Sequence, residues 1–127
     1  MPEYEFEIAE TLSRVPVHFA AGEQAREAIN RLQKSLRWLD ALVDRHPNIL
    51  QYQRTKAHAH YRLGLLLMHS QETSDEARLN IREAVEVQAG ICDQFPDSLA
   101  DVAWLARMRT RLEGPQTERP ESSVDAP

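Results

Sequence analysis

The feature that most constrains this chain is an internal repeat with a period of 49 residues. When the sequence is shifted along itself by that length, Pro47 falls on Pro96, and most coinciding residues are apolar or turn-forming. A shift of 48 residues adds the N-terminal stretch, so that Ala9 falls on Ala57. Tandem units of this kind bury a continuous core by stacking on their neighbours, and this chain holds about two and a half of them. Other coinciding pairs are Ala28 with Ala77, Leu32 with Ile81, Leu42 with Ile91, Leu63 with Leu112, and Tyr4 with Tyr52.

Apolar residues within each unit recur every three or four positions, which is the period of an amphipathic helix. No stretch alternates with period two over a useful length, so the sequence predicts an all-α fold. The periodic stretches predict five helices, over roughly residues 3–20, 23–46, 49–69, 74–95 and 98–113. We expect Thr73 to open a capping box with Glu76, and Asn48 and Asp97 to serve as N-caps.

Residues 114–127 differ in composition from the rest of the chain. They contain three prolines and no aromatic residue, which is too little apolar surface to offset the entropy of ordering them. The sequence therefore predicts one helical domain, residues 1–113, followed by a disordered proline-rich tail, residues 114–127.

The order of small and large residues within the unit resembles that of a known family. Leu63-Gly64, Ala77, Ile81, Ala84 and Pro96 fall in the order of tetratricopeptide (TPR) repeats, over roughly residues 3–113. The resemblance implies a TPR-like array of antiparallel helix hairpins, an α-solenoid, in which small residues mark close helix contacts. The unit of 49 residues is longer than the family's 34, which implies extended helices. Pro16 replaces the glycine of the first unit and should kink the first helix.

Long-helix repeats of this kind are similar to those appended to bacterial Ser/Thr protein kinases and extracytoplasmic-function sigma factors. The resemblance implies a cytoplasmic location in a bacterial signalling protein, although no kinase or sigma-factor motif occurs in this sequence. One cysteine excludes an internal disulfide, and the acidic N-terminus lacks the apolar segment of a signal peptide. The longest purely apolar run, Leu65 to Met68, is too short for a membrane span. The net charge of -5 argues against direct nucleic-acid binding.

The residue types that carry catalysis or bind metals do not form a convincing site. His58 and His60 lie two apart on a predicted helix and point about 200° apart, so they cannot share a metal from that helix alone. Cys92 lies on the apolar stripe, where a small buried hydrophobic residue is the better interpretation. We therefore expect no enzymatic activity, no metal and no cofactor, and a metal-binding or enzymatic domain is only a remote alternative.

The best candidate site is the concave groove that the first helices of TPR units line. Carried onto this chain, the family's groove positions imply a mixed surface for a peptide with an apolar anchor and an acidic or C-terminal carboxylate. The competing interpretation is that the apolar members belong to the interhelical core and that the basic ones are solvated. The candidate residues are Val17, Arg54, His58, Tyr61, Leu65, Met68 and Arg107.

Two functions of different classes follow from this sequence. The first is a non-catalytic adaptor or scaffold module that binds a protein or peptide partner. The second is a self-assembly module, because an array of two and a half units leaves open ends on which neighbouring repeats tend to stack.

Overall fold

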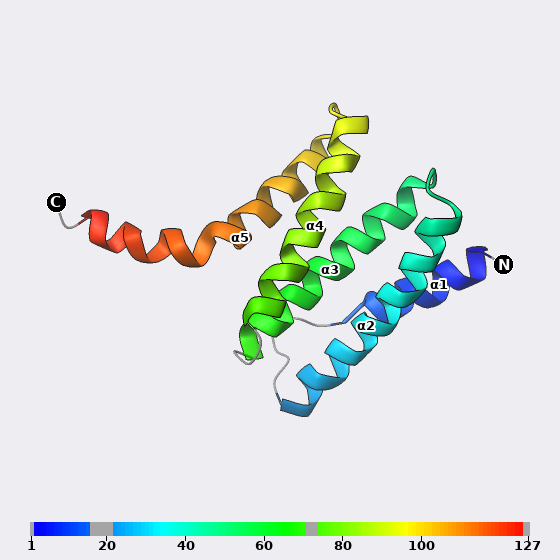
Figure 1. Cartoon of the computed structure of the whole chain (residues 1–127), viewed down its shortest axis with the longest axis horizontal. Coiled ribbons are helices and arrows are strands. Elements are labelled where there is room, and N and C mark those ends of the chain that lie inside the picture. The colour runs from blue at the N-terminus through cyan, green and yellow to red at the C-terminus, as the bar shows by residue number, and fades with distance from the viewer. Residues whose placement is uncertain (1, 16–21, 71–73, 126–127) are drawn as a thin grey trace.

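The structure, a computed structural model, describes residues 2–15, 22–70 and 74–125. Within these ranges it is all-helical, which confirms the predicted fold class. Each helix packs mainly against the helices next to it in the sequence, and α5 extends away from the other four (Figure 1). The five helices are α1 (Pro2–Ser13), α2 (Gly22–Arg45), α3 (Leu50–Ser70), α4 (Ser74–Gln94) and α5 (Leu99–Asp125).

The α2–α3 and α4–α5 turns have the same backbone hydrogen bonds at positions 49 residues apart. The amide of His46 donates to the carbonyl of Leu42 at 2.8 Å, and the amide of Phe95 donates to the carbonyl of Ile91 at 2.9 Å. Ile49 then donates to His46 at 3.3 Å, as Ser98 donates to Phe95 at 3.1 Å. The period found in the sequence therefore recurs in the local backbone structure.

The buried faces of α2 and α4 recur with the same period. Every buried position of α4 has a buried counterpart on α2, although the polarity of the residue differs in two pairs, and buried Leu36 of α2 corresponds to partly buried Val85. Serine and leucine on α2 correspond to alanine and glutamine on α4, so the register is kept while the polarity of the core changes. The pairs are Ala28 with Ala77, Leu32 with Ile81, Ser35 with Ala84, Leu39 with Gln88, and Leu42 with Ile91.

Gly64 lies at a close approach of α3 and α4, as its place in the repeat predicts. A Cβ atom at this position would overlap the side chain of Ile81 and lie 3.0 Å from the carbonyl oxygen of Ala77. Ala77 is fully buried, so the two backbones meet where both side chains are minimal.

The substitution Gly64→Ala should destabilise the fold, whereas Gly90→Ala should stabilise it. Alanine gains roughly 0.5–1 kcal/mol over glycine within a helix. At Gly64, overpacking of about 1–3 kcal/mol opposes that gain. At Gly90, in α4, no atom lies within 4 Å of the added methyl group, so the gain should appear alone. Urea titrations of both variants measure the two signs, and a stabilised Gly64→Ala would contradict the close helix contact.

The helix ends differ from the predicted ones in three places. α1 ends at Ser13 instead of continuing to residue 20, because a proline disfavours helical backbone in the residue before it, here Val15. The residues that directly precede α3 and α5 are Ile49 and Ser98, so Asn48 and Asp97 are not the N-caps. Each lies one residue earlier, inside the turn that the proline begins. The predicted capping residue Thr73 lies outside the described residues.

The C-terminal end of α5 also differs from the prediction. The sequence predicts a helix end near residue 113, but the backbone of α5 is helical through Asp125. The predicted end is too early because it assumes that Pro115 and Pro120 end the helix. A proline removes one backbone donor and bends a helix without necessarily ending it. None of the helices in the described ranges has the length and apolar character needed to cross a membrane.

Candidate functional site

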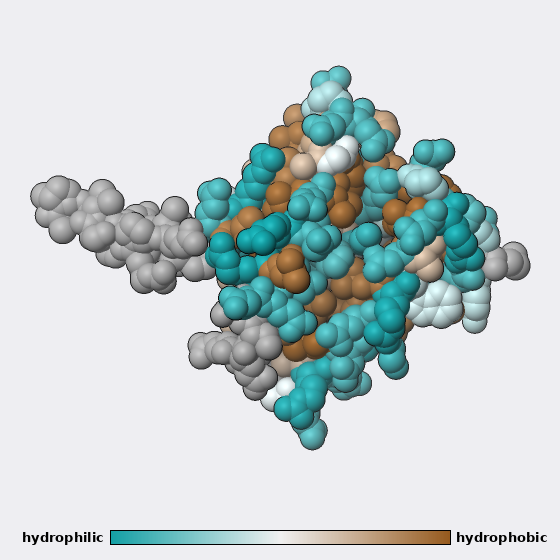
Figure 2. Space-filling view, in the orientation of Figure 1, coloured by the Kyte–Doolittle hydropathy of each residue, from teal (hydrophilic) through white to brown (hydrophobic). Residues whose placement is uncertain are grey.

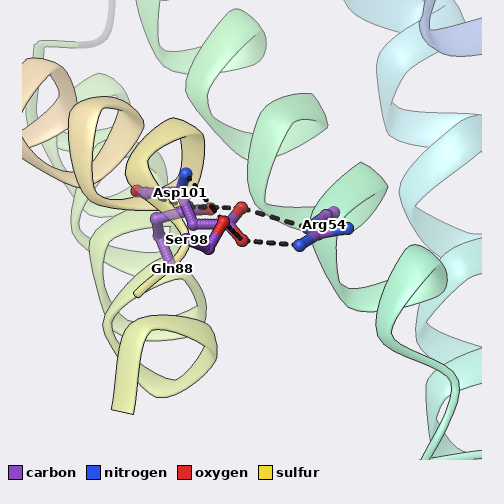
Figure 3. Close-up of polar contacts among 4 residues, drawn as sticks. All are labelled: Arg54, Gln88, Ser98 and Asp101. Atoms are coloured by element: carbon purple, nitrogen blue, oxygen red, sulfur yellow. Dashed lines mark hydrogen bonds and ion pairs between the residues drawn. The ribbon is translucent and has the colours of Figure 1, made fainter. Parts of the chain in front are cut away.

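A polar cluster joins α3, α4 and α5 near the start of α5 (Figure 3). Arg54 of α3 donates two hydrogen bonds to the carboxylate of Asp101, from Nε to Oδ1 at 3.0 Å and from Nη2 to Oδ2 at 2.6 Å. The Ser98 hydroxyl donates to Asp101 Oδ2 at 2.7 Å, and the Gln88 amide donates to the Asp101 carbonyl at 2.9 Å. The Asp101 side chain is 5% exposed, so the carboxylate is held by protein donors rather than by solvent.

The two charges of this cluster stabilise each other. The hydrogen bond from Arg54 holds the pKa of Asp101 below its usual range, and the same bond raises the pKa of Arg54. Among the described residues, Gln88 Oε1 is buried without a hydrogen-bond partner. We interpret the arrangement as a polar connection between helices.

The corresponding contact in the preceding unit is apolar. Arg54 corresponds to Phe6 at an offset of 48 residues, and Asp101 corresponds to Tyr52 at an offset of 49. The rings of Phe6 and Tyr52 lie 4.9 Å apart between centroids, and both side chains are buried. An aromatic pair between α1 and α3 is thus replaced by an ion pair between α3 and α5. The buried position of Leu39 changes likewise, to Gln88.

An aromatic cluster continues the contact between α3 and α5 along both helices. The ring of Trp104 lies 4.4 Å from that of His58 and 6.1 Å from that of Tyr61, between centroids. The Arg107 guanidinium lies over the indole at 4.9 Å, within the range of a cation–π interaction. Burial, followed by the charge of Arg62, lowers the pKa of His58 to about 4. His58 is therefore neutral at pH 7.

Acidification should destabilise the fold in two separate pH ranges. His58 has a folded pKa of about 4, below its ordinary 6.5, so its stabilising contribution is complete above pH 6.5 and is lost as the pH falls towards 4. The pKa of Asp101 is lowered below 3.8, so its contribution is lost at still lower pH. His58→Phe should keep the stacking on Trp104 and remove only the first loss. Urea midpoints of parent and variant between pH 7 and pH 4 measure this, and parallel curves would contradict the assignment.

The predicted groove residues are only partly brought together. Arg54 already pairs with the chain's own Asp101, and Tyr61 is buried. Leu65 and Met68 are partly buried against the core, as the competing interpretation of the sequence expects. Arg107 is exposed beside Trp104, and Val17 lies outside the described residues. The summed positive charge that the groove hypothesis requires is thus reduced by the Asp101 carboxylate and by the neutral His58.

The outer face of α5 carries an exposed apolar surface that the sequence analysis missed. We call it the α5 stripe. Its helical members recur at the spacing of one helix face, and the largest, Leu99, is 82% exposed. Figure 2 shows hydrophobic surface gathered over the end of the molecule where α4 and α5 meet. The members are Phe95, in the turn before α5, and Leu99, Val102, Ala103 and Ala106.

The repeat supplied a signal for this stripe. Ala57 on α3 and Ala106 on α5 correspond at an offset of 49 residues. Ala57 is 0% exposed, in a cluster with Ile81 and Ala84 of α4, whereas Ala106 is exposed. This position is therefore covered by the following helix in one unit and uncovered in the next, within the part of the chain that the structure describes.

His60 and Cys92 have surroundings that are typical of structural residues. His60 Nδ1 lies 2.9 Å from Asn80 Oδ1. Burial raises the pKa of the half-buried Cys92 thiol, which opposes the thiolate form that a nucleophile needs. Across residues 2–15, 22–70 and 74–125, no three His, Cys, Asp or Glu side chains are grouped as metal ligands.

Comparison with known proteins finds no relative of this chain. No protein-family model, no curated protein and no solved structure matches the chain.

Proposed function

We propose that this chain is a non-catalytic, TPR-like helical-repeat module that binds another protein by receiving an amphipathic helix on the α5 stripe. The observation that carries the proposal is the exposure of this apolar stripe, which includes Ala106, whose counterpart Ala57 is buried against α4. A row of apolar residues on one helix face is the surface that helix-in-groove recognition uses.

The repeat indicates the geometry of such a partner. On α3, the surface around Ala57 is covered by α4, which follows α3 in a helical hairpin. A partner helix that takes the equivalent place would lie along α5 and contact Ala103 and Ala106, whose small side chains allow two helices to approach closely. Leu99 and Val102 would supply the larger apolar anchors.

The charges beside the α5 stripe favour an acidic partner. Arg107 and Arg109 are exposed and lie about 80° to either side of the stripe on a helical wheel. Acidic residues that flank the apolar face of a partner helix would thus meet opposite charge, which aids encounter and fixes orientation. This preference retains the predicted acidic partner but moves its site from the inner groove to the outer face of α5.

A binding titration with a defined probe tests the proposal. The probe is a synthetic, fluorescently labelled amphipathic helix with a Leu/Ala stripe flanked by glutamates. Leu99→Lys with Val102→Lys should weaken its binding at least about tenfold, because two anchors become cations within the apolar contact. Leu79→Lys, at an exposed leucine of α4, is the matched control and should bind as the parent does. Equal binding to all three chains, or none to the parent, would overturn the proposal.

Two other parts of the function are proposed from the sequence alone. A place within a bacterial signalling protein, in the cytoplasm, is proposed from the resemblance of the repeats alone. The concave groove stays a separate prediction, and the α5 stripe is favoured over it because Arg54 already has a carboxylate partner and Tyr61 is buried.

A further inference from the structure

We infer that one occupant of the α5 stripe is a second copy of this chain, which docks through the outer face of α1. This inference rests on the proposed function, because it uses the same surface and names its partner. The two helices at opposite ends of the packed series, α1 and α5, present complementary charges and exposed apolar residues.

α1 has the composition that the α5 stripe favours. It carries four acidic residues and no lysine or arginine between Pro2 and Ser13. Glu5 pairs with Arg45 at 2.5 Å and Glu10 pairs with Arg14 at 3.5 Å. The other two acidic residues, Glu3 and Glu7, are exposed on the side of α1 that faces away from α2.

The exposed side of α1 also carries two apolar side chains and a threonine at helical spacing. Tyr4 is 64% exposed, Ile8 is half-buried and Thr11 is exposed, and these residues follow one another by four and then three positions. The buried residues Phe6, Ala9 and Ser13 lie on the opposite side and contact the rest of the fold. The outer face of α1 is therefore a short apolar row with acidic residues beside it.

α5 presents the complementary surface. Exposed Arg107 and Arg109 flank the end of the α5 stripe that is further from the α4–α5 turn, and Leu99 and Val102 lie nearer to that turn. An antiparallel arrangement of α1 on α5, with residue 3 opposite residue 107, brings Glu3 opposite Arg107 and places Glu7 about one helical turn from it. The same arrangement brings Ile8 and Thr11 opposite Leu99 and Val102. Residues 3–11 of α1 and 99–107 of α5 both extend about 12 Å, so the two rows match in length.

The symmetry of this contact follows from its two different surfaces. A face of α1 that binds a face of α5 is a heterologous interface, which leaves one α1 and one α5 uncovered at the ends of every open assembly. One helix face from each partner is a small contact area, which is typical of weak association. The expected behaviour is therefore a gradual, salt-sensitive growth in mass with concentration rather than a stable closed dimer.

Light scattering or sedimentation equilibrium measures this growth. At low salt, the average mass should rise above the 14.6 kDa of one chain as the concentration increases from about 10 µM to about 1 mM. At about 0.5 M salt, it should return towards the mass of one chain, because the Debye length falls below about 5 Å. A mass of one chain at every concentration and salt would overturn the inference.

Mixing two variants tests the orientation of the contact. One variant blocks α5 with Leu99→Lys and Val102→Lys, and the other blocks α1 with Tyr4→Lys and Glu7→Lys. Each should be monomeric alone, but their mixture should form a 1:1 complex, because one retains an intact α1 and the other an intact α5. Circular dichroism and thermal melts establish that both variants are folded. The matched control, Leu79→Lys with Glu86→Lys on α4, should assemble as the parent does.

The outcomes separate this inference from the proposed function. Self-association of the α1-blocked variant by itself would show a twofold contact between α5 helices and would overturn the arrangement. Monomeric behaviour of the mixture would do the same. The parent chain could stay monomeric and still bind the synthetic acidic helix more tightly than the variant with Leu99→Lys and Val102→Lys does. In that case only the inference about a second copy fails. If the probe does not bind, the proposed function itself fails.

Discussion

Replacement of Asp101 with alanine should destabilise the fold by about 2–4 kcal/mol. The substitution leaves Arg54 without its carboxylate and removes the acceptor that the Ser98 hydroxyl uses. The Asp101 side chain is 5% exposed, but that of Arg54 is 40% exposed, so water recovers part of the cost. For this reason we expect a loss below the upper end of the range for fully buried ion pairs. Urea unfolding at pH 7 gives the value, and an unchanged midpoint would show that the pair carries no stability.

The repeat supplies a matched control for this experiment. The triple variant Arg54→Phe, Gln88→Leu and Asp101→Tyr transplants the residues of the preceding unit, where Phe6, Leu39 and Tyr52 are buried. Replacement of a whole ion pair by packed apolar residues of similar size is often neutral or stabilising. We expect this variant to lie within about 1 kcal/mol of the parent chain, because Gln88 Oε1 no longer remains without a partner. A loss as large as that of Asp101→Ala would show that the two contacts are not equivalent.

The substitutions Ala28→Trp and Ala77→Trp should destabilise the fold by similar amounts, each about 1–3 kcal/mol. Both alanines are buried and occupy corresponding places on α2 and α4, so tryptophan overpacks a helix contact in each unit. Ala106→Trp is the control, because Ala106 is exposed and should accept the larger side chain without loss of stability. Thermal melts of the three variants at low protein concentration give the comparison. A parent-like melt for either buried position would argue against the 49-residue register.

The helices and their register were predictable because they depend on local periodicity and on small residues at fixed places. The apolar stripes of α2 and α4 were predictable from apolar residues three and four positions apart. The close helix contact at Gly64 was predictable from the position of this glycine in the repeat. Helix ends were less predictable. α1 ends at Ser13 because Pro16 restricts the backbone of Val15, the residue before it. The helical periodicity of the sequence continues beyond Ser13, so periodicity alone predicts a longer helix.

The polar contacts of the candidate site were harder to predict, since they join residues far apart in sequence. Arg54 and Asp101 are 47 residues apart, and nothing local pairs them. The repeat did contain a signal, because Phe6 and Tyr52 occupy the corresponding places, and a simultaneous change to arginine and aspartate suggests an ion pair. The low pKa of His58 depends on burial beneath Trp104, which single-residue patterns do not reveal.

Backbone NMR titration with the synthetic acidic helix is the measurement that tests the α5 stripe most directly. We expect the largest amide shifts at residues 95–110, around Leu99, Val102 and Ala106, with little change on α3. Shifts concentrated at Arg54, His58 and Leu65 would contradict it, because they would place the partner in the inner groove instead.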